Sequence, residues 1–565
     1  LAGSIRRTCS LRLPIYFPLP GSDPARPDES EEPDSPATAA INTTPISGDI
    51  NVKSWIECNA RRLVVALAVG GCVLALSGCG SSDNVASPAP VDYAALCTKI
   101  NGQQFNGITV TATSRIAAAG DNPGYCKVSA TGAASTTLDI EVDLPDNWSK
   151  RLLQQGGGGF DGSIPTVEAT SAQFPLIKPL ARGIAYTASN GGNRTGNPAD
   201  LLTNATAQKD YAYASTGITV HFAKAVVAAF YGSAPKYTYF SGASNGGREA
   251  YLAAQNQPGD YDGIIAGDES MNMGTQVAAM LNIATLAGSA AMPSNAQWTA
   301  AYSAAVAQCG NANGVILNPA ACTFDPATLQ CGASGAPAAT CLSPAQLQTV
   351  QRIVAPLSTS GGQLLFSGYN WADFGSMFGV GSYGGLGGGF AALGTGNANW
   401  LLPATVPGSL QANFNVDTSY PVIAAGLQNV GADHNLQAIA QYLMAGKKLI
   451  SFNGAADPLI SPRDHLRNWQ TVVQLAGSAG SNARFYLEPG VGHVLGGNGP
   501  DQTDYLGAMI AWVEQGTAPG QLVLTKFDSN GNATSSLPDC PYPTVPHYSG
   551  SGSVSAAASY TCATS

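Results

Sequence analysis

The sequence predicts an α/β fold of the α/β-hydrolase type: a mostly parallel sheet with helices on both faces, interrupted by an inserted lid domain. Strand-like and helix-like segments alternate between residues 96 and 270, and again between residues 431 and 565. The intervening residues 271–430 break this rhythm, are rich in Ala and Gly, and hold four cysteines. Regular alternation of strands and helices is typical of a parallel sheet covered on both sides. The irregular segment is therefore assigned to the lid.

The individual elements follow from the periodicity of the apolar residues. Residues 136–145 alternate apolar and polar side chains, as a half-buried strand does. Apolar residues recur at helical spacing through 211–232, and this helix is expected to end at Gly232. The other expected strands are 151–155, 183–189, 236–242, 261–268, 446–454 and 483–490. The other expected helices are 245–255 and 504–516.

The first part of the chain is expected to lie outside the fold. Residues 1–51 include the acidic, Pro-rich stretch 23–36, which is typical of disorder, and they contain no Met, so part of them is expected to be untranslated. Residues 52–78 have the layout of a signal peptide, with basic residues before the apolar run Leu63–Leu76. That run is too short for an ordinary membrane-spanning helix.

The end of this signal resembles a bacterial lipobox. Leu76-Ser77-Gly78 precedes Cys79, which would become lipidated and N-terminal after cleavage. Residues 79–95 would then be a tether. The alternative is a plain secretory signal with a chance cysteine. Either way the mature chain is expected outside the cytoplasm, as an outer-membrane-anchored lipoprotein or as a periplasmic or extracellular protein of a Gram-negative bacterium. Its membrane contact would be limited to the anchor at Cys79.

Cysteine usage agrees with export. Four of the 12 cysteines lie at or before Cys79, and the eight that remain are an even number, as disulfide pairing in an oxidising compartment requires. They form sequence-near couples, and we expect local disulfides. These are Cys97–Cys126, Cys309–Cys322, Cys331–Cys341 and Cys540–Cys562. The spacing by itself leaves other pairings open.

Composition excludes several classes of protein. The chain is 44% hydrophobic and 11% charged, with a formal net charge of −10 and no basic tract interleaved with aromatic residues. A nucleic-acid partner therefore has little support. CxxC and HExxH patterns are missing from the sequence, which gives no support to a metal site. We expect a small-molecule ester as the partner and no cofactor, and the oligomeric state is left open.

The strongest chemical signal is Gly242-Ala243-Ser244-Asn245-Gly246, which fits the pattern G-x-S-x-G. By itself this pattern is weak, because a glycine-rich chain contains it by chance. Here it lies between an expected strand and an expected helix, where a strained turn lifts a serine hydroxyl clear of the sheet. Ser244 is therefore the expected nucleophile, and a glycine-rich turn without chemistry is the alternative.

The expected base and acid follow later strands. Of five histidines, only His493 sits in a loop at the end of an expected strand, where α/β proteins place catalytic groups. Asp457 follows the strand 446–454 and precedes His493 in the chain, as the acid should. The alternative role of Asp457 is a cap before Pro458. An oxyanion site would draw one N–H from Asn245 and one from the Gly-rich loop after residues 151–155, at Gly157 or Gly158.

Several longer motifs carry a resemblance to a known family. They are GYCKVSAT, GGGGFDGS, YFSGASNGGREA, YDGIIAGD, ADPLISP and PGVGHVLGGNGPD. Residues 96–562 resemble the tannase and feruloyl esterase family, which includes mono(2-hydroxyethyl) terephthalate hydrolases. The resemblance implies an α/β-hydrolase core, a lid and hydrolysis of esters of aromatic acids. Ser244, Asp457 and His493 fall on the family's triad positions.

The chain departs from the family's pattern at three places. A cysteine pair beside the nucleophile and after the histidine is replaced by Ala243 and Val494. The loop Cys309–Gly314, where the family binds calcium with aspartates, has no carboxylate, and a hard cation prefers charged oxygens. We therefore expect calcium to be weak or absent. The segment before the acid is Asn453-Gly454-Ala455-Ala456 instead of the usual His-Gly-Trp-Ala.

Together these features predict an exported serine carboxylic-ester hydrolase acting on aromatic or bulky apolar acyl esters through an acyl-enzyme. The first alternative is a hydrolase of 3-hydroxybutyrate-type oligomers, because Ser-Asn-Gly-Gly also resembles that group. The second is a catalytically inactive binding lipoprotein on the same scaffold. Aromatic residues of the lid are expected to contact the acyl group: Trp371, Phe374, Phe378, Tyr383 and Trp400.

Overall fold

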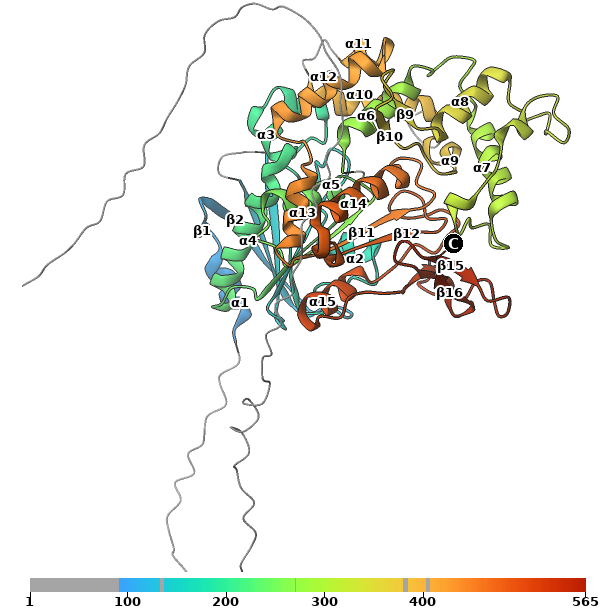
Figure 1. Ribbon diagram of the computed structural model, residues 1–565. Helices are drawn as coiled ribbons and strands as arrows, with labels where there is room; N and C mark the ends of the chain where they lie inside the picture. Colours follow the sequence, from blue (N-terminus) through green and yellow to red (C-terminus); the bar gives the residue numbers. More distant parts are fainter. Residues whose placement is uncertain (1–90, 133–136, 270, 380–384, 403–406, 565) are drawn as a thin grey trace, which may run out of the picture. The chain divides into compact units, whose positions relative to one another are not determined.

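The computed structural model describes residues 91–132, 137–269, 271–379, 385–402 and 407–564. The expected upstream segment, signal peptide and lipidated Cys79 lie outside these residues. In the described part, ten strands form one large sheet in the order β1-β2-β3-β4-β6-β5-β7-β8-β11-β12. Residues 88–565 form one compact unit around it, and Figure 1 shows the strands running through its centre.

The sheet is parallel where it carries the site and antiparallel at one edge. The parallel strands are β5 (Arg151–Gln155), β6 (Ile184–Ser189), β7 (Tyr237–Ala243), β8 (Gly263–Gly267), β11 (Lys448–Gly454) and β12 (Ala483–Glu488). The antiparallel edge consists of β1 (Gln104–Phe105), β2 (Ile108–Ile116), β3 (Tyr125–Thr131) and β4 (Asp139–Pro145). The expectation of a mostly parallel sheet is confirmed, and the antiparallel strands β1 to β3 extend it beyond what the sequence predicted.

Two hydrophobic layers cover the two faces of the sheet. Neighbouring residues of one strand point to opposite faces, so Leu152 of β5 packs in one layer and Leu153 in the other. The first layer holds helices α1 (Tyr93–Ile100), α4 (Ser215–Tyr231), α5 (Asn245–Asn256), α13 (Leu436–Met444) and α14 (Pro462–Ala476). The second holds α2 (Val167–Gln173) and α15 (Tyr505–Gln515). Helices on both faces confirm the α/β-hydrolase architecture.

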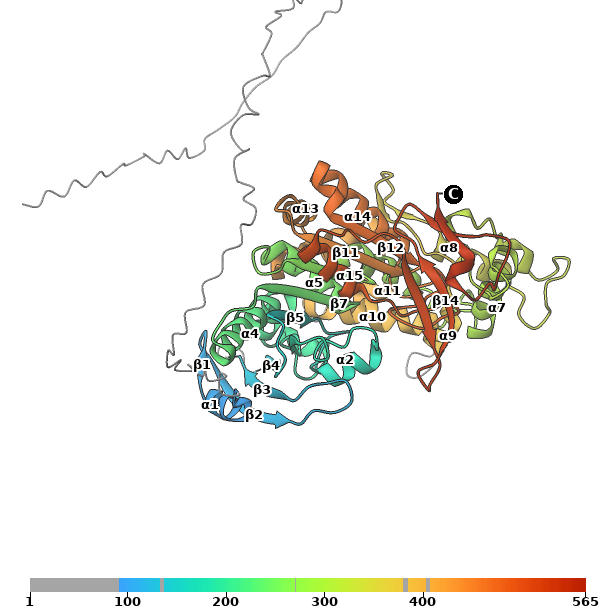
Figure 2. The same cartoon turned by 90° about the horizontal axis from the view of Figure 1, so that it is seen from below.

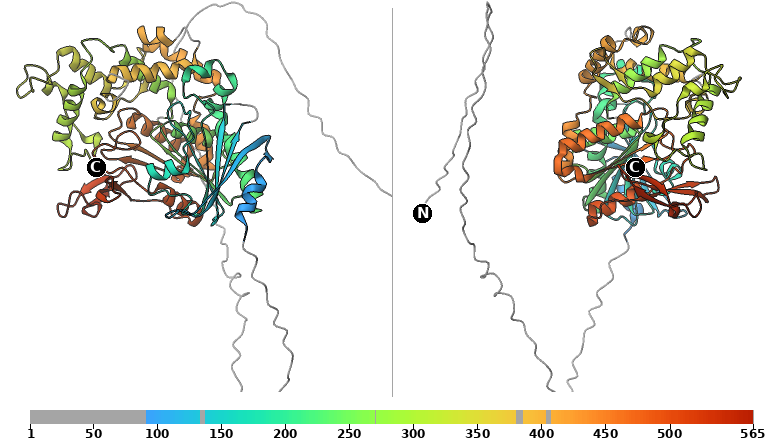
Figure 3. Two further views of the ribbon diagram at one scale, coloured as in Figure 1. Left: turned by 180° about the vertical axis from the view of Figure 1, so that it is seen from behind. Right: turned by 45° about the vertical axis from the view of Figure 1, so that its right-hand side comes forward.

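Between β8 and α13 the chain forms a helical insertion that packs in two further hydrophobic clusters, one of which it shares with residues 201–212. Its helices are α6 (Met273–Ala284), α7 (Asn295–Cys309), α8 (Pro344–Val354), α9 (Phe374–Gly379), α10 (Leu386–Leu401), α11 (Pro407–Ala412) and α12 (Val416–Val430). A short hairpin joins β9 (Leu357–Ser358) to β10 (Leu364–Phe366). Figures 1 and 3 show these helices gathered at one end of the sheet. Because these helices do not alternate with strands of the large sheet, the strand–helix rhythm of the sequence stops here.

Two small hairpins end the chain. They are β13 (Leu522–Phe527) with β14 (Ala533–Asp539), and β15 (Val545–Tyr548) with β16 (Tyr560–Ala563). Figure 2 shows them in red beside β12. The structure contains all four expected disulfides, of which Cys97–Cys126 ties α1 to β3 and Cys540–Cys562 ties the two hairpins together. None of the helices in the described part of the chain has the length and apolar composition needed to cross a membrane.

Candidate active site

Ser244 occupies a tight turn between β7 and α5. Its backbone has φ +58° and ψ −128°, a conformation that costs energy for any residue with a side chain. A Cβ atom at Gly242 would lie 2.3 Å from the carbonyl oxygen of Gly246, and one at Gly246 would lie 2.7 Å from that of Gly157. The glycines of the G-x-S-x-G motif are thus required by close backbone contact. The turn projects the serine from the carboxyl end of the sheet.

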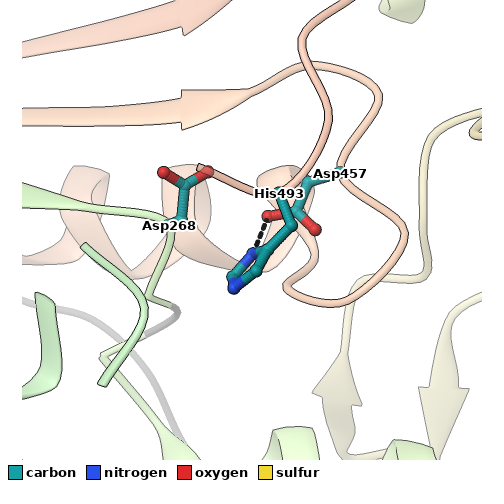
Figure 4. Close-up of side chains that lie close together, drawn as sticks. All are labelled: Asp268, Asp457 and His493. Carbon is teal, nitrogen blue, oxygen red and sulfur yellow. Dashed lines mark hydrogen bonds and ion pairs between the residues drawn. The ribbon is translucent and has the colours of Figure 1, made fainter. Parts of the chain in front are cut away.

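The structure brings Ser244, His493 and Asp457 into one chain of hydrogen bonds. The Oγ of Ser244 lies 2.9 Å from Nε2 of His493, and Nδ1 of His493 lies 2.8 Å from Oδ2 of Asp457. Figure 4 shows the contact between His493 and Asp457. The three residues follow β7, β12 and β11, whose carboxyl ends meet at the same edge of the sheet. This is the geometry of a nucleophile, its base and the acid that orients the base.

The electrostatics of the site favour a proton on His493. Burial lowers the pKa of the imidazole, but the charge of Asp457 and the hydrogen bond to it outweigh this effect and raise the pKa of His493 above its usual value. The other oxygen of Asp457, Oδ1, accepts the N–H groups of Leu459 at 2.7 Å and Ile460 at 3.0 Å. These bonds fix the carboxylate in place, so the imidazole is held in the tautomer that accepts the serine proton at Nε2.

The predicted oxyanion donors differ in whether their N–H groups already have a hydrogen-bond partner. Asn245 begins α5, and the first N–H groups of a helix have no partner within it. The N–H of Gly157, however, donates to Oε2 of Glu249 at 3.0 Å. This removes Gly157 from the predicted pair of donors, because one N–H group that already serves a carboxylate is not free for substrate. In the described part of the chain the N–H of Gly158 makes no hydrogen bond, so Gly158 and Asn245 are left as the candidate donors.

A buried polar network lies behind these donors. Arg248 is 1% exposed, and its guanidinium donates to Oδ1 of Asn245 at 2.7 Å and to the carbonyl oxygens of Tyr211 and Ala212. The amide of Asn245 in turn donates to Asp161. Burial raises the pKa of Glu249, while the charge of Arg248 and the N–H of Gly157 act against that rise. The sequence did not indicate this network, since its members come from separate loops and helices.

Known proteins share both the sequence pattern and the fold. The family model described as "Tannase and feruloyl esterase" matches residues 125–399 and 413–563. The chain belongs to this family. An uncharacterized esterase of Xanthomonas campestris is 31% identical over 507 residues, covering 78% of this chain and 84% of that protein. The mono(2-hydroxyethyl) terephthalate hydrolase of Piscinibacter sakaiensis is 28% identical, covering 78% of this chain and 85% of that protein. This chain is accordingly an esterase with a small-molecule ester substrate.

A solved structure supports the fold assignment. Feruloyl esterase B from Aspergillus oryzae superposes with a TM-score of 0.70 at 22% identity, over 84% of this chain and 100% of that one. At this identity the comparison supports the fold and not the substrate. The tannase-family resemblance and the α/β-hydrolase core predicted from the sequence are therefore both confirmed.

A cavity opens beside Ser244 in this tannase-family esterase, and we call it the Ser244 cavity. Its apolar lining is Phe160, Met273, Val277, Met280, Leu393, Leu459 and Ile460. Its polar lining includes Tyr211, Arg248, Glu269, Gln276 and Asn397. A second hollow opens at His493 and is lined by Tyr302, Asp373, Met377, Pro458 and Leu495. The nucleophile and the base therefore face separate spaces.

The aromatic residues expected to contact substrate lie elsewhere. Phe374 and Trp400 are almost completely buried, Phe374 against Trp298 and Trp400 against Tyr211. Trp371 packs on Phe324, away from the Ser244 cavity. Tyr383 and the side chain of Phe378 lie outside the described residues. An inserted segment must fill its own hydrophobic clusters first, so its largest side chains are drawn inward, and Phe160 and the methionines of α6 line the cavity instead.

The structure shows what surrounds the residues at which the chain departs from the family's cysteine and calcium patterns. Ala243 and Val494 line the same cavity, whose lining does not include Ser244, Asp457 or His493. In the loop at Cys309, Oδ1 of Asn311 accepts the N–H groups of Asn313 and Val315. The amide of Asn313 donates to the carbonyl oxygen of Val554. These neutral side chains are engaged with protein groups and do not fit the charged oxygen cage that calcium prefers.

Proposed function

We propose that this chain is an exported serine esterase that hydrolyses neutral esters with an aromatic or bulky apolar acyl group. The observation that carries the serine mechanism is the hydrogen-bond chain from Ser244 through His493 to Asp457. Nε2 of His493 takes the Ser244 proton while Oγ attacks the ester carbonyl. The N–H groups of Asn245 and Gly158 stabilise the oxyanion.

The second half of the reaction reuses the same groups. Protonated His493 gives its proton to the departing alcohol, which leaves the acyl group on Ser244. A water molecule then attacks the acyl-enzyme as His493 takes its proton, and Ser244 is released with the free acid. Because His493 protonates the alcohol, we assign the alcohol to the hollow at His493 and the acyl group to the Ser244 cavity.

The charge of the lining favours a neutral acyl group. Of the residues that the structure places around the Ser244 cavity, Arg248 is the one cation, and its guanidinium is already bound to three acceptors. Glu269 lines the same cavity, and its carboxylate would repel an anion. The sequence between Arg352 and Lys447 contains no Lys or Arg. A desolvated carboxylate without a cationic partner is costly.

An ester panel with a covalent probe tests this function. Purified parent protein should hydrolyse aryl-acyl methyl esters and react with a fluorophosphonate, and Ser244→Ala should lose the labelling and lower kcat by several orders of magnitude while remaining folded. Turnover above about 10% of the parent in Ser244→Ala removes Ser244 from the mechanism. Hydrolysis of hydroxybutyrate dimers with none of aryl esters favours the oligomer hydrolase, and absence of labelling favours the inactive binding lipoprotein.

We further propose that Cys79 anchors the mature protein to a membrane and that no calcium is needed. The lipobox-like Leu76-Ser77-Gly78-Cys79 supports the anchor, and the neutral, occupied side chains at Asn311 and Asn313 support the absence of calcium. Acyl-probe labelling that persists in Cys79→Ser contradicts the anchor. A lower melting temperature after a calcium chelator is added contradicts the proposal that no calcium is needed.

A further inference from the structure

A third ionisable side chain stands beside Asp457 and His493. Asp268 directly follows β8, the strand between the nucleophile strand β7 and the acid strand β11. One oxygen of Asp268, one oxygen of Asp457 and one ring nitrogen of His493 all lie within 4.8 Å of one another. Figure 4 shows these three side chains. Asp268 is completely buried, and its backbone φ is +48°. A strained backbone at a buried carboxyl group is a feature of functional sites.

Asp268 is held by groups that also hold Asp457. Its Oδ1 accepts the N–H of Gly454 at 3.0 Å and the side-chain amide of Asn453 at 3.2 Å. The same amide nitrogen of Asn453 lies 3.4 Å from Oδ2 of Asp457, the oxygen that accepts from His493. Asn453 therefore joins the two carboxyl groups into one unit.

The orientation of the Asn453 amide is fixed from behind by His465. Burial lowers the pKa of His465 to about 3, so the ring is neutral and carries one N–H. Nδ1 of His465 lies 2.8 Å from Oδ1 of Asn453, and Nε2 lies 2.6 Å from the hydroxyl of Tyr251. A neutral ring satisfies both contacts when Nδ1–H donates to Asn453 and Nε2 accepts from Tyr251. The NH₂ group of Asn453 must then face the two carboxyl groups.

The two carboxyl groups share one negative charge. Burial and the charge of Asp457 raise the pKa of Asp268 to about 8, against the opposing effect of His493. Two carboxylates this close do not both ionise readily, and the raised pKa favours the protonated form of Asp268. Two further carboxyl groups interact with this group of residues: Asp268 contributes to the raised pKa of Glu488, and Glu269 contributes to the raised pKa of His493. Removing Asp457 takes away one of the effects that raise the pKa of Asp268, while the charge of His493 continues to lower that pKa.

We propose that Asp268 is a second acid of this site, a positioning residue that acts through Asp457 and His493 and that orients the imidazole when Asp457 is lost. The inference rests on the proposed serine mechanism. In the parent, Asp268 is the neutral neighbour that steadies the Asp457–His493 pair. Without the Asp457 carboxylate, the pKa of Asp268 falls, and its ionised form places a negative charge near the ring of His493.

A double-mutant cycle tests the proposal. Asp268→Asn should lower kcat/KM about threefold when it is made in the parent. Made in Asp457→Ala, the same substitution should lower the kcat/KM of that variant at least about tenfold. Asp143→Asn is the matched control, because Asp143 is also a completely buried carboxyl group but lies on β4. Asp143→Asn should lower kcat/KM by the same factor in the parent and in Asp457→Ala. An equal cost of Asp268→Asn in both backgrounds overturns the proposal.

The titration of His493 gives a readout that needs no substrate. The chain has five histidines, so isotope-labelled histidine resolves the ring of His493 by NMR. The pKa of His493 should fall by about one unit from Asp457→Ala to the Asp457→Ala/Asp268→Asn double variant, because the second carboxyl group of the Asp268–Asp457 pair is lost. An unchanged pKa overturns the proposal. If Asp457→Ala does not fold, Asp457→Asn replaces it in both experiments.

The two readouts separate the inference from the function on which it rests. If the parent hydrolyses no ester and binds no fluorophosphonate, the proposed function fails, and the His493 titration still decides whether Asp268 controls the imidazole. If the parent is active and the cycle shows no coupling, the serine mechanism stands and the second acid is wrong.

Discussion

Gly157 donates its N–H to Oε2 of Glu249 at 3.0 Å, which ties the glycine-rich loop after β5 to helix α5. The same helix begins next to the nucleophile, with Asn245 as its first residue. The two candidate oxyanion donors, Gly158 and Asn245, are therefore set at a fixed separation by a buried carboxyl group one turn into α5. We therefore expect Glu249 to act on the proposed oxyanion site through Gly157 and not through contact with the substrate.

Replacing Glu249 should damage catalysis more than binding. Glu249→Ala frees the Gly157 N–H and loosens the loop, so we expect kcat to fall by about 10–100-fold with KM changed less, since a lost oxyanion donor costs about 3–4 kcal/mol at most. Glu249→Gln keeps an oxygen acceptor and should lose less. The measurement is steady-state kinetics on a neutral aryl ester. A rise in KM at unchanged kcat would instead place Glu249 in substrate binding.

The lining of the Ser244 cavity predicts a preference for uncharged substrates. A neutral aromatic methyl ester should have the higher kcat/KM when compared with its para-carboxylate analogue, because Arg248 is occupied and Glu269 repels an anion. Glu269→Gln should reduce the difference in kcat/KM between the neutral ester and the para-carboxylate ester. A preference of tenfold or more for the anionic ester, about 1.4 kcal/mol of transition-state binding, would show that a cation does reach the acyl group.

The turn at Ser244 should not tolerate a side chain at Gly242. A Cβ atom there would lie 2.3 Å from the carbonyl oxygen of Gly246, so Gly242→Ala must displace backbone at the nucleophile. We expect a loss of about 1–3 kcal/mol in stability and a fall in kcat of more than about 100-fold. Gly259→Ala is the control, because nothing lies within 4 Å of a Cβ atom there. Equal behaviour of the two variants in thermal unfolding and turnover would refute the close-contact argument.

A buried pair of carboxyl groups near the C-terminal hairpins should make stability depend on pH. The Tyr505 hydroxyl lies 2.9 Å from Oε1 of Glu488 and 2.7 Å from Oδ2 of Asp539. One hydroxyl proton serves only one of these oxygens at a time, and burial raises the pKa of Asp539 from 3.8 to about 7. The protonated form is therefore favoured by folding. Its stabilising effect is complete below about pH 4 and is lost as the pH rises through 7.

Asp539→Asn removes this titration. Relative to the parent, the melting temperature of Asp539→Asn should be higher at pH 8 than at pH 5, with the difference in unfolding free energy growing by up to about 1.4 kcal/mol for each pH unit between 4 and 7. Thermal unfolding monitored by circular dichroism across this range measures the effect. A constant difference between variant and parent at every pH would mean that Asp539 titrates normally in the folded protein.

Much of the site could be predicted because it follows strand ends. Ser244, Asp457 and His493 all come just after expected strands, and the structure joins them by hydrogen bonds of 2.8 and 2.9 Å. Strand positions are readable because hydrophobic periodicity is a local property. The antiparallel hairpin of β2 and β3 was missed, since its exposed residues weaken the alternation.

The substrate contacts could not be predicted in the same way. Trp400 and Phe374 are large aromatic residues of the kind that line ligand pockets, but both are buried in hydrophobic clusters. Phe160, which does line the Ser244 cavity, lies in the loop after β5, far from the insertion in sequence. Which aromatic side chain faces a cavity depends on how helices pack against each other, and a periodic pattern carries no information about that.

The sequence by itself determined the family and the α/β core, and it predicted Ser244, Asp457 and His493 as a triad, because these depend on local patterns and on which residues follow a strand. Only the tertiary structure decided that Gly157 serves Glu249 and that Asp268 stands beside Asp457. Both relationships join residues that are about 90 to 190 positions apart in the chain. The raised pKa of Asp268 and the engaged N–H of Gly157 both arise from burial and close approach, which exist only once the sheet has brought its strand ends together.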